Sequence, residues 1–196
     1  QVELPALIAI QNAQFSATGG AVITGTVAGA TYSTTGLWYD YSTTGYSHTY
    51  PLITATGENS RVELPGIVSL DASISGSGND SDTQTITASD GGVIDLSGLE
   101  RIDSPEGYYD QLNITVEDGS SQVLLNSLEE VSAATSGWCG STDFIARGGA
   151  QLSLPSLARI TRSGGSVWGR AFHFTATDAN TRIEVPVLSA IDNAEF

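Results

Sequence analysis

Residues Leu152-Ser-Leu-Pro-Ser-Leu-Ala-Arg-Ile160 decide the fold, because the same phrase recurs along the chain. The shared template is h-x-h-(P/S/N)-x-h-x-x-h, in which h is an apolar residue. Further copies begin at Val2, Val62, Ile94, Val123 and Ile183. The third position of the template falls at Leu64, Leu96, Leu125, Leu154 and Val185, so successive copies are 32, 29, 29 and 31 residues apart. A period of about 30 residues that tolerates small insertions is typical of a solenoid.

A second pattern precedes each copy of the template. Large apolar and small apolar residues alternate with mostly Thr, as in Ile53-Thr-Ala-Thr56, Ile86-Thr-Ala-Ser89 and Phe174-Thr-Ala-Thr177. Alternation with a period of two predicts a strand with one buried face, and a corner such as Asp90-Gly-Gly92 follows it. The sequence therefore predicts an all-β fold, a right-handed parallel β-helix of about six to seven coils of roughly 30 residues. A leucine-rich repeat would require Asn after its L-x-L and usually a shorter period.

The whole chain, residues 1–196, is expected to form one solenoid domain, which we interpret as a module from a longer polypeptide. Ala21-Val-Ile-Thr-Gly-Thr-Val27 is a degenerate copy of the template, with Ile23 as its third position. Residues 31–51, which follow it, are rich in Tyr, Thr, Ser and Gly and are expected to form a loop insertion. That loop either covers one end of the core or offers a rigid, adaptable binding surface.

The charge of the chain excludes several kinds of partner. Its 22 acidic residues outnumber 7 basic ones, all of them Arg, which gives a formal net charge of −15. Nucleic acids and anionic membranes are therefore not expected as partners, because binding to them depends on neutralising negative charge. No stretch is long and apolar enough to span a bilayer. The acidic, lysine-free composition, rich in Thr, Ser, Gly and Asn, favours a secreted protein.

Aromatic residues recur in the longest loop of several coils at a nearly constant distance from the template. Their offsets from its third position lie between 12 and 16 residues, and the set is Trp38, Tyr39, Tyr108, Tyr109, Trp138 and Trp168. Equal offsets stack vertically in a parallel β-helix, so these rings are predicted to form a stripe along one side. The stripe either fills the interior or lies outside. Polar neighbours, as in Ser136-Gly-Trp-Cys-Gly140, favour the outside.

An exposed row of aromatic rings suits sugars, whose C–H faces are apolar and whose edges carry hydroxyls. Asp110, Gln111, Asp143 and Arg170 follow the aromatic residues and are expected to bind those hydroxyls. The coil spacing is close to the length of one sugar unit in an extended β-linked chain. The acidic balance favours a neutral polysaccharide, namely xylan or alternatively β-glucan or mannan.

Two other classes of function compete with sugar binding. A β-helix that cleaves polysaccharides would need two carboxylates at one bond, for which Asp103 with Glu106 and Asp110, or Glu129 with Glu130, are candidates. None of these groups forms a specific motif. A structural segment of a bacterial adhesin is the other alternative. Outward Thr pairs also resemble the ladders of ice-binding solenoids, although Glu117, Ile145 and Arg147 interrupt the array.

Calcium is the one ion for which the sequence offers ligands, because two His and one Cys make no standard zinc cage. Asn79, Asp80 and Asp82 form an oxygen-rich segment, and outward Glu63 and Asp95 are expected to stack in neighbouring coils. The alternative without calcium is that the first segment is a solvated turn and that Glu63 and Asp95 form a mildly repulsive ladder. We therefore expect no cofactor, with calcium as the alternative.

The L-P-x-L-x-x-I phrase resembles the repeats of large bacterial surface β-helix proteins and, more distantly, the receptor L domains. Together with the size, the acidity and the aromatic stripe, the chain is similar to the β-helical carbohydrate-binding modules of family 89, which accompany bacterial xylanases. The resemblance implies a non-catalytic module that binds xylan and holds an attached glycoside hydrolase near its substrate. It carries no family motif onto particular residues of this chain.

Overall fold

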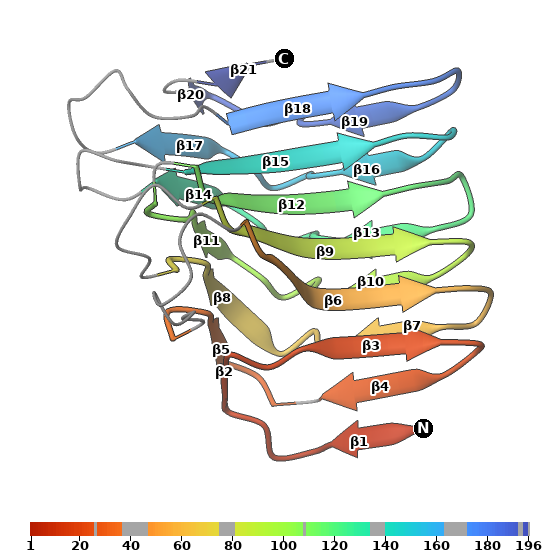
Figure 1. Cartoon of the computed structure of the whole chain (residues 1–196). Helices are drawn as coiled ribbons and strands as arrows, with labels where there is room; N and C mark the ends of the chain where they lie inside the picture. The colour runs from red at the N-terminus through yellow and green to blue at the C-terminus, as the bar shows by residue number, and fades with distance from the viewer. Residues whose placement is uncertain are drawn as a thin grey trace.

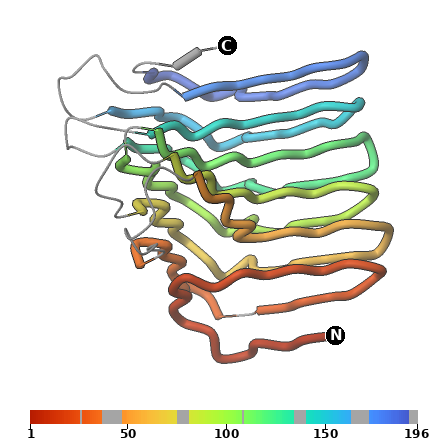
Figure 2. Tube along the Cα trace, in the orientation of Figure 1, coloured from red at the N-terminus to blue at the C-terminus, as the bar shows by residue number. Residues whose placement is uncertain are grey.

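The computed structural model describes residues 1–25, 27–36, 47–74, 81–107, 109–133, 140–162, 172–191 and 194–195. Within these ranges every regular element is a β-strand, and the strands stack in parallel as a right-handed β-helix (Figure 1). Each coil contributes three strands, one to each side of the solenoid, and the two termini lie at opposite ends of it (Figure 2). The described residues form no helix that is long and apolar enough to cross a membrane. The predicted fold class is confirmed.

The first strand of each coil lies on the side that we call sheet A. Sheet A contains β1 (Val2–Leu4), β4 (Val22–Gly25), β7 (Arg61–Glu63), β10 (Val93–Asp95) and β13 (Gln122–Leu124). A two-stranded sheet, β16 (Gln151–Ser153) and β19 (Arg182–Glu184), continues this side of the solenoid (Figure 1).

The second and third strands of each coil form two seven-stranded sheets. Sheet B contains β2 (Ala9–Gln11), β5 (Ala30–Ser33), β8 (Ile67–Asp71), β11 (Arg101–Asp103), β14 (Glu130–Ala133), β17 (Arg159–Arg162) and β20 (Ala190–Ile191). Sheet C contains β3 (Phe15–Thr18), β6 (Thr49–Thr56), β9 (Thr83–Ser89), β12 (Gln111–Val116), β15 (Ser141–Ala146), β18 (Phe172–Ala176) and β21 (Ala194–Glu195). The chain therefore makes seven coils, the upper end of the predicted number.

The repeated template is the corner between sheet A and sheet B. In each regular copy the N–H of the sixth position donates to the carbonyl of the third, as Leu99 does to Leu96 at 2.9 Å and Leu128 to Leu125 at 3.2 Å. This is the hydrogen bond of a β-turn, for which Pro, Ser or Asn at the intervening fourth position is suitable. All four apolar positions of the inner copies point into the core: Leu152, Leu154, Leu157 and Ile160 are each at most 1% exposed. The template thus encodes one turn and its buried anchors.

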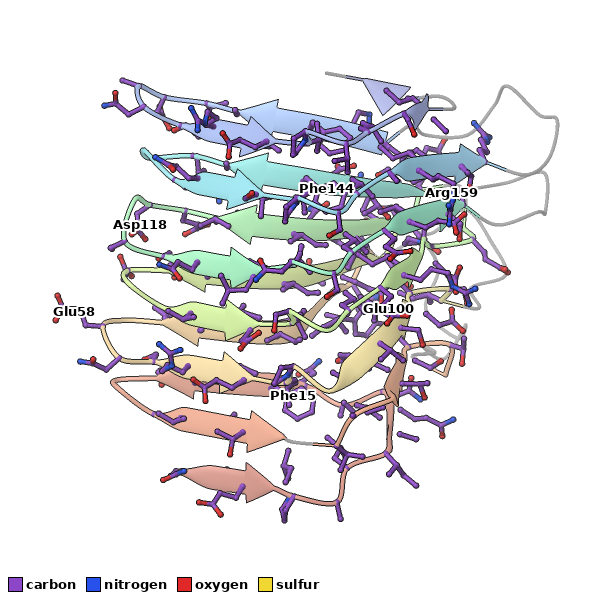
Figure 3. The ribbon with its side chains drawn as sticks, turned by 180° about the vertical axis from the view of Figure 1, so that it is seen from behind. Phe15, Glu58, Glu100, Asp118, Phe144 and Arg159 are labelled. Atoms are coloured by element: carbon purple, nitrogen blue, oxygen red, sulfur yellow. The ribbon has the colours of Figure 1, made fainter. Side chains whose placement is uncertain are left out.

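Sheet C supplies the largest side chains of the interior. Strand alternation directs Ile86, Ile114 and Phe144 inward in one column, and each of them is fully buried. The rings of Phe144 and Phe174 stack in consecutive coils with centroids 5.1 Å apart and planes 12° apart. Figure 3 shows Phe144 among the packed side chains between the sheets. Stacking like residues on like residues fills the solenoid without large gaps.

The corners between sheet C and sheet A alternate along the solenoid. The corners after β3, β9 and β15 contain consecutive residues with positive φ, such as Gly148 at 64° and Gly149 at 83°. Their N–H groups donate to the next corner: Gly148 to Asp178 Oδ2 at 3.0 Å and Gly149 to Thr181 Oγ1 at 2.9 Å. Asp90 and Gly91 donate in the same way to Asp118 and Ser121, and Gly20 donates to Ser60. The corners that accept these hydrogen bonds follow β6, β12 and β18. Counted between paired strand positions, each of them is one residue longer than the donating corners. Each donating corner is therefore hydrogen-bonded to the accepting corner of the next coil.

Asp118 has the densest hydrogen bonding of these corners, and Figure 3 shows it at this end of the coil. Its carboxylate accepts the N–H of Asp90 at 2.7 Å, the N–H groups of Ser120 and Ser121, and both of their hydroxyls. Partial burial raises the pKa of this carboxyl, but the hydrogen bonds outweigh burial and hold the pKa well below its usual range.

Residues 31–51 are not a loop throughout, because they begin in β5 and end in β6. Tyr32 is only 2% exposed, its ring meets Phe15 edge-on at 6.2 Å, and its hydroxyl donates to the carbonyl of Ala13. Burial raises the pKa of Tyr32. This tyrosine therefore belongs to the core, at the position that Leu70 occupies in the next coil.

The degenerate second coil has a different register from the predicted one. Ile23 pairs with Val2 and Val62, which are first positions of the template, so Gly25 rather than Ile23 occupies the third position. Thr31 follows Gly25 by 6 residues, whereas its partner Ser69 follows Leu64 by 5, so the second coil has one extra residue before sheet B. At the register shift between Ala30 and Thr31 the ladder skips Val68 of β8. Counted in sequence from Gly25, Trp38 has an offset of 13, the same as Trp138 from Leu125.

The template copies at the two ends of the solenoid are less buried than the inner ones. Val2 is 52% exposed and Ile191 is 49% exposed, whereas the equivalent Val62 and Ile102 are fully buried. An inner coil has a neighbour on each side, so its apolar residues are covered twice.

Candidate functional site

Most of the predicted aromatic stripe lies outside the described residues. This holds for Trp38, Tyr39, Tyr108, Trp138, Trp168 and Arg170, and also for the calcium candidates Asn79 and Asp80. The predicted residues that the structure describes are Tyr109, Asp110, Asp143 and Asp82. All four lie at the beginning of strands of sheet C, which enter the sheet from the longest loops of the coils.

Tyr109 and Asp110 precede β12, and their side chains have opposite environments. Tyr109 is 38% exposed, one of few large side chains with apolar surface exposed to this degree. Asp110 is 2% exposed and its Oδ1 accepts the N–H of Asp82 in the coil below at 2.9 Å. This carboxylate extends the hydrogen bonding between coils beyond the start of the strands. Asp110 therefore has a role within the fold, and its binding of sugar hydroxyls stays a prediction.

Asp82 repeats this arrangement one coil lower. It is 4% exposed, and its Oδ1 accepts the N–H of His48 at 3.3 Å and lies 3.6 Å from His48 Nδ1. The described part of the chain contains no group of three His, Cys, Asp or Glu side chains that could hold a metal ion. Glu63 and Asp95 do stack in neighbouring strands, as predicted. Glu63 accepts from Arg61 at 2.5 Å and Asp95 accepts the N–H of Ser97 at 2.9 Å.

Asp143 faces outward from β15 and pairs with His173, directly opposite it in β18. Their atoms Oδ1 and Nδ1 are 2.7 Å apart, and the two side chains are 17% and 29% exposed. A carboxylate can only accept, so Nδ1 of His173 donates in this hydrogen bond. The pair therefore fixes both side chains on the outer face of sheet C.

Two neighbouring polar atoms on the same face lack a partner within the described residues. They are Asn113 Oδ1 and Ser141 Oγ, and both atoms are buried. Asn113 lies beside Asp143 in the ladder, and Ser141 beside Gln111, so the four residues form two adjacent outward columns. Leaving a buried polar atom unpaired costs about 1–3 kcal/mol, so each such position calls for a partner.

We call the set Tyr109, Gln111, Asn113, Ser141, Asp143 and His173 the sheet C site. It combines a partly exposed aromatic ring, a fixed carboxylate–imidazole pair, an amide and two polar atoms that require a partner. Asp143 is the only carboxylate among these six residues, and its Oδ1 lies 2.7 Å from Nδ1 of His173. These groups suit a neutral ligand that carries several hydroxyls and an apolar face.

Sequence reasoning identified Tyr109, Gln111 and Asp143 but not Asn113, Ser141 and His173. The available signal was the alternation of side chains along the strands of sheet C. The Thr residues of the lower strands point outward, and the same alternate positions in the upper strands hold Gln111, Asn113, Asp143 and His173. Ser141 occupies such a position too, yet it is fully buried. Nothing in the sequence distinguishes it from a solvated serine.

The outer face of sheet B carries a second feature, a surface depression of about 250 Å³. It is lined by Val68, Ser69, Glu100, Arg101, Glu129, Glu130 and Arg159, and Figure 3 labels Glu100 and Arg159 there. Glu130 Oε2 lies 3.2 Å from Arg159 Nη2, and its Oε1 accepts from Thr161 at 3.0 Å.

Three of the acidic residues predicted for an enzyme, Asp103, Glu129 and Glu130, lie on this side of the solenoid. Glu130 is engaged by Arg159 and Thr161, while Asp103 accepts from Ser132 Oγ at 2.6 Å and pairs with Arg101 at 3.1 Å. Asp110, the proposed companion of Asp103, is buried at the start of sheet C. A glycosidase needs its two carboxyl groups on either side of one bond, so this division does not suit that chemistry.

Comparison of the chain with family models, with curated proteins and with solved structures finds no match in any of the three.

Proposed function

We propose that this chain is a non-catalytic carbohydrate-binding module that binds a neutral plant cell-wall polysaccharide at the sheet C site. Xylan is the favoured ligand, and β-glucan and mannan are the alternatives. The observation that carries the proposal is partly exposed Tyr109 beside the accessible polar side chains Gln111, Asn113, Asp143 and His173 on the outer face of sheet C. In this proposal the polar side chains bind sugar hydroxyls, while the tyrosine ring takes the apolar face of a sugar.

The electrostatics of the chain support a neutral ligand over an acidic one. A net charge of −15 repels polyuronates as it repels nucleic acids, and no lysine is present to neutralise a uronate. In this proposal the module is secreted and is joined to a glycoside hydrolase, which it keeps close to an insoluble substrate. Tethering then raises the effective substrate concentration without any catalytic contact.

Affinity electrophoresis in gels containing xylan, β-glucan or mannan tests the proposal. We expect at least one neutral polysaccharide to retard the protein, and Tyr109→Ala to weaken binding roughly three- to ten-fold through the loss of ring stacking. Asn113→Ala should weaken it as well. Glu100→Gln, on the outer face of sheet B, is the matched control and should bind like the wild type.

The failures of this test are informative. Unretarded migration in all three gels would contradict the proposal and would favour a structural segment of a surface protein. Release of reducing sugars by the isolated chain would instead favour the polysaccharide-degrading enzyme. Retention that Tyr109→Ala and Asn113→Ala leave unchanged would place binding elsewhere on the molecule.

A further inference from the structure

The two columns of the sheet C site continue along the solenoid beyond the site itself. Gln111 and Ser141 belong to the column Thr49, Thr83, Gln111, Ser141, and Asn113 and Asp143 belong to the column Pro51, Thr85, Asn113, Asp143, His173. The strands that carry them, β6, β9, β12, β15 and β18, lie side by side in Figure 1. The first column therefore crosses four consecutive coils and the second crosses five, both in a direction parallel to the solenoid axis.

Below the site, these columns carry polar groups and no charge. Thr83 and Thr85 are partly exposed, and their side chains make no hydrogen bond within the described part of the chain. Pro51 contributes an apolar surface between them and the lower coils. In a chain with 22 acidic residues, the absence of charge from these positions favours a ligand that is itself neutral.

The spacing of the columns sets the repeat of the ligand. Neighbouring strands lie about 4.8 Å apart, so each coil presents the same pair of outward positions once per strand. One unit of an extended β-linked polysaccharide covers nearly the same distance. A polymer lying along the columns would therefore meet the same outward strand positions at every unit, whereas a polymer lying across them would meet one coil only.

Resting on the proposed function, we propose that the polysaccharide lies parallel to the solenoid axis along these two columns, with one sugar unit on each coil. Asp143 and His173, whose side chains are 17% and 29% exposed, mark the upper end of this path independently of the threonines. The ligand class is a linear, neutral, β-linked chain. About five sugar units span the path from β6 to β18 at the spacing of parallel strands.

A length series of neutral oligosaccharides, from two to eight units, tests the direction of binding by isothermal titration calorimetry. The oligosaccharides come from the polysaccharide that retards the protein in gels. Affinity should rise with each added unit and level off at about five, when every coil of the path is occupied. A plateau at two or three units would overturn the axial path.

Thr85→Val and Thr87→Val form a matched pair within β9. Both replace an outward threonine hydroxyl with a methyl group, but only Thr85 lies on the proposed path, because Thr87 belongs to the column of Thr54 and Thr115. Thr85→Val should weaken the longest oligosaccharide about three- to ten-fold through the loss of one hydrogen bond, and it should shift the plateau to shorter chains. Thr87→Val should change neither.

The result separates this inference from the proposed function. If Tyr109→Ala and Asn113→Ala weaken binding while Thr85→Val behaves like Thr87→Val, the module binds polysaccharide but the axial path is wrong. If no oligosaccharide and no polysaccharide binds, both fail. Equal melting temperatures of the two valine variants will show that the comparison reports on binding rather than on folding.

Discussion

Sheets B and C consist of the same number of parallel strands around one core, yet their outer faces differ in kind. Sheet B presents charges of alternating sign, since Arg101, Glu130 and Arg159 occupy one column in successive coils. The lower part of sheet C presents Thr, Pro and Ser in every outward position. The inward residues therefore determine the coil, whereas the outward residues differ between the two faces without changing the coil.

If sheets B and C share one core, a substitution in that core should destabilise both sheets more than any substitution on their outer faces. Phe144→Ala removes a fully buried ring from the stack with Phe174, and it should lower the free energy of unfolding by roughly 3–5 kcal/mol. Chemical denaturation measures this loss. Hydrogen exchange should accelerate in β15 and in β17 together. Acceleration confined to β15 would mean that sheets B and C are separate cooperative units.

A smaller effect is expected at the corner carboxylate Asp118, and it depends on pH. Hydrogen bonds hold the folded pKa below that of the unfolded chain, so this group stabilises the fold above an unfolded pKa of about 4. That stability is lost as the pH falls through the folded value. Between pH 5 and 2 the melting temperature of the wild type should fall more steeply than that of Asp118→Asn. Parallel curves would show that other carboxylates cause acid unfolding.

The smallest effect is expected on the outer face of sheet B. Glu130→Gln breaks the ion pair with Arg159, whose side chain is 51% exposed, so the free energy of unfolding should change by about 1 kcal/mol or less and should depend on salt. Polysaccharide retention should equal that of the wild type, in contrast with substitutions in sheet C. A loss of binding in Glu130→Gln would remove the functional distinction between the two faces.

Much of the fold follows from the sequence, because its signal repeats. The apolar template, the period near thirty and the alternation in sheet C each recur in coil after coil, so chance agreement at one position does not matter. The second coil escapes correct alignment because Gly25 stands where the other copies have Leu or Val, and because one extra residue separates Gly25 from sheet B. The alignment of one degenerate copy has no second copy to correct it.

The site was less predictable, because its members are single residues whose role depends on what lies beside them. The residues around Asp110 have the composition of a surface loop. Its carboxylate nevertheless accepts the N–H of Asp82, which in a regular ladder would be bonded to a strand carbonyl. Asn113 and Ser141 become notable only when burial and missing partners are known. His173 could be assigned to an outward position from sequence, whereas its contact with Asp143 required the register of β15 and β18.

The alternating corners have a consequence for how such a rod changes in length. Each short corner with two left-handed residues gives its N–H groups to the longer corner above it, as Gly148 and Gly149 do to Asp178 and Thr181. Deleting one coil would place two donor corners, or two acceptor corners, next to each other. Duplication or deletion of a pair of coils would keep every donor opposite its acceptor. The building block of this solenoid is therefore a double coil, and viable length variants should differ by even numbers of coils.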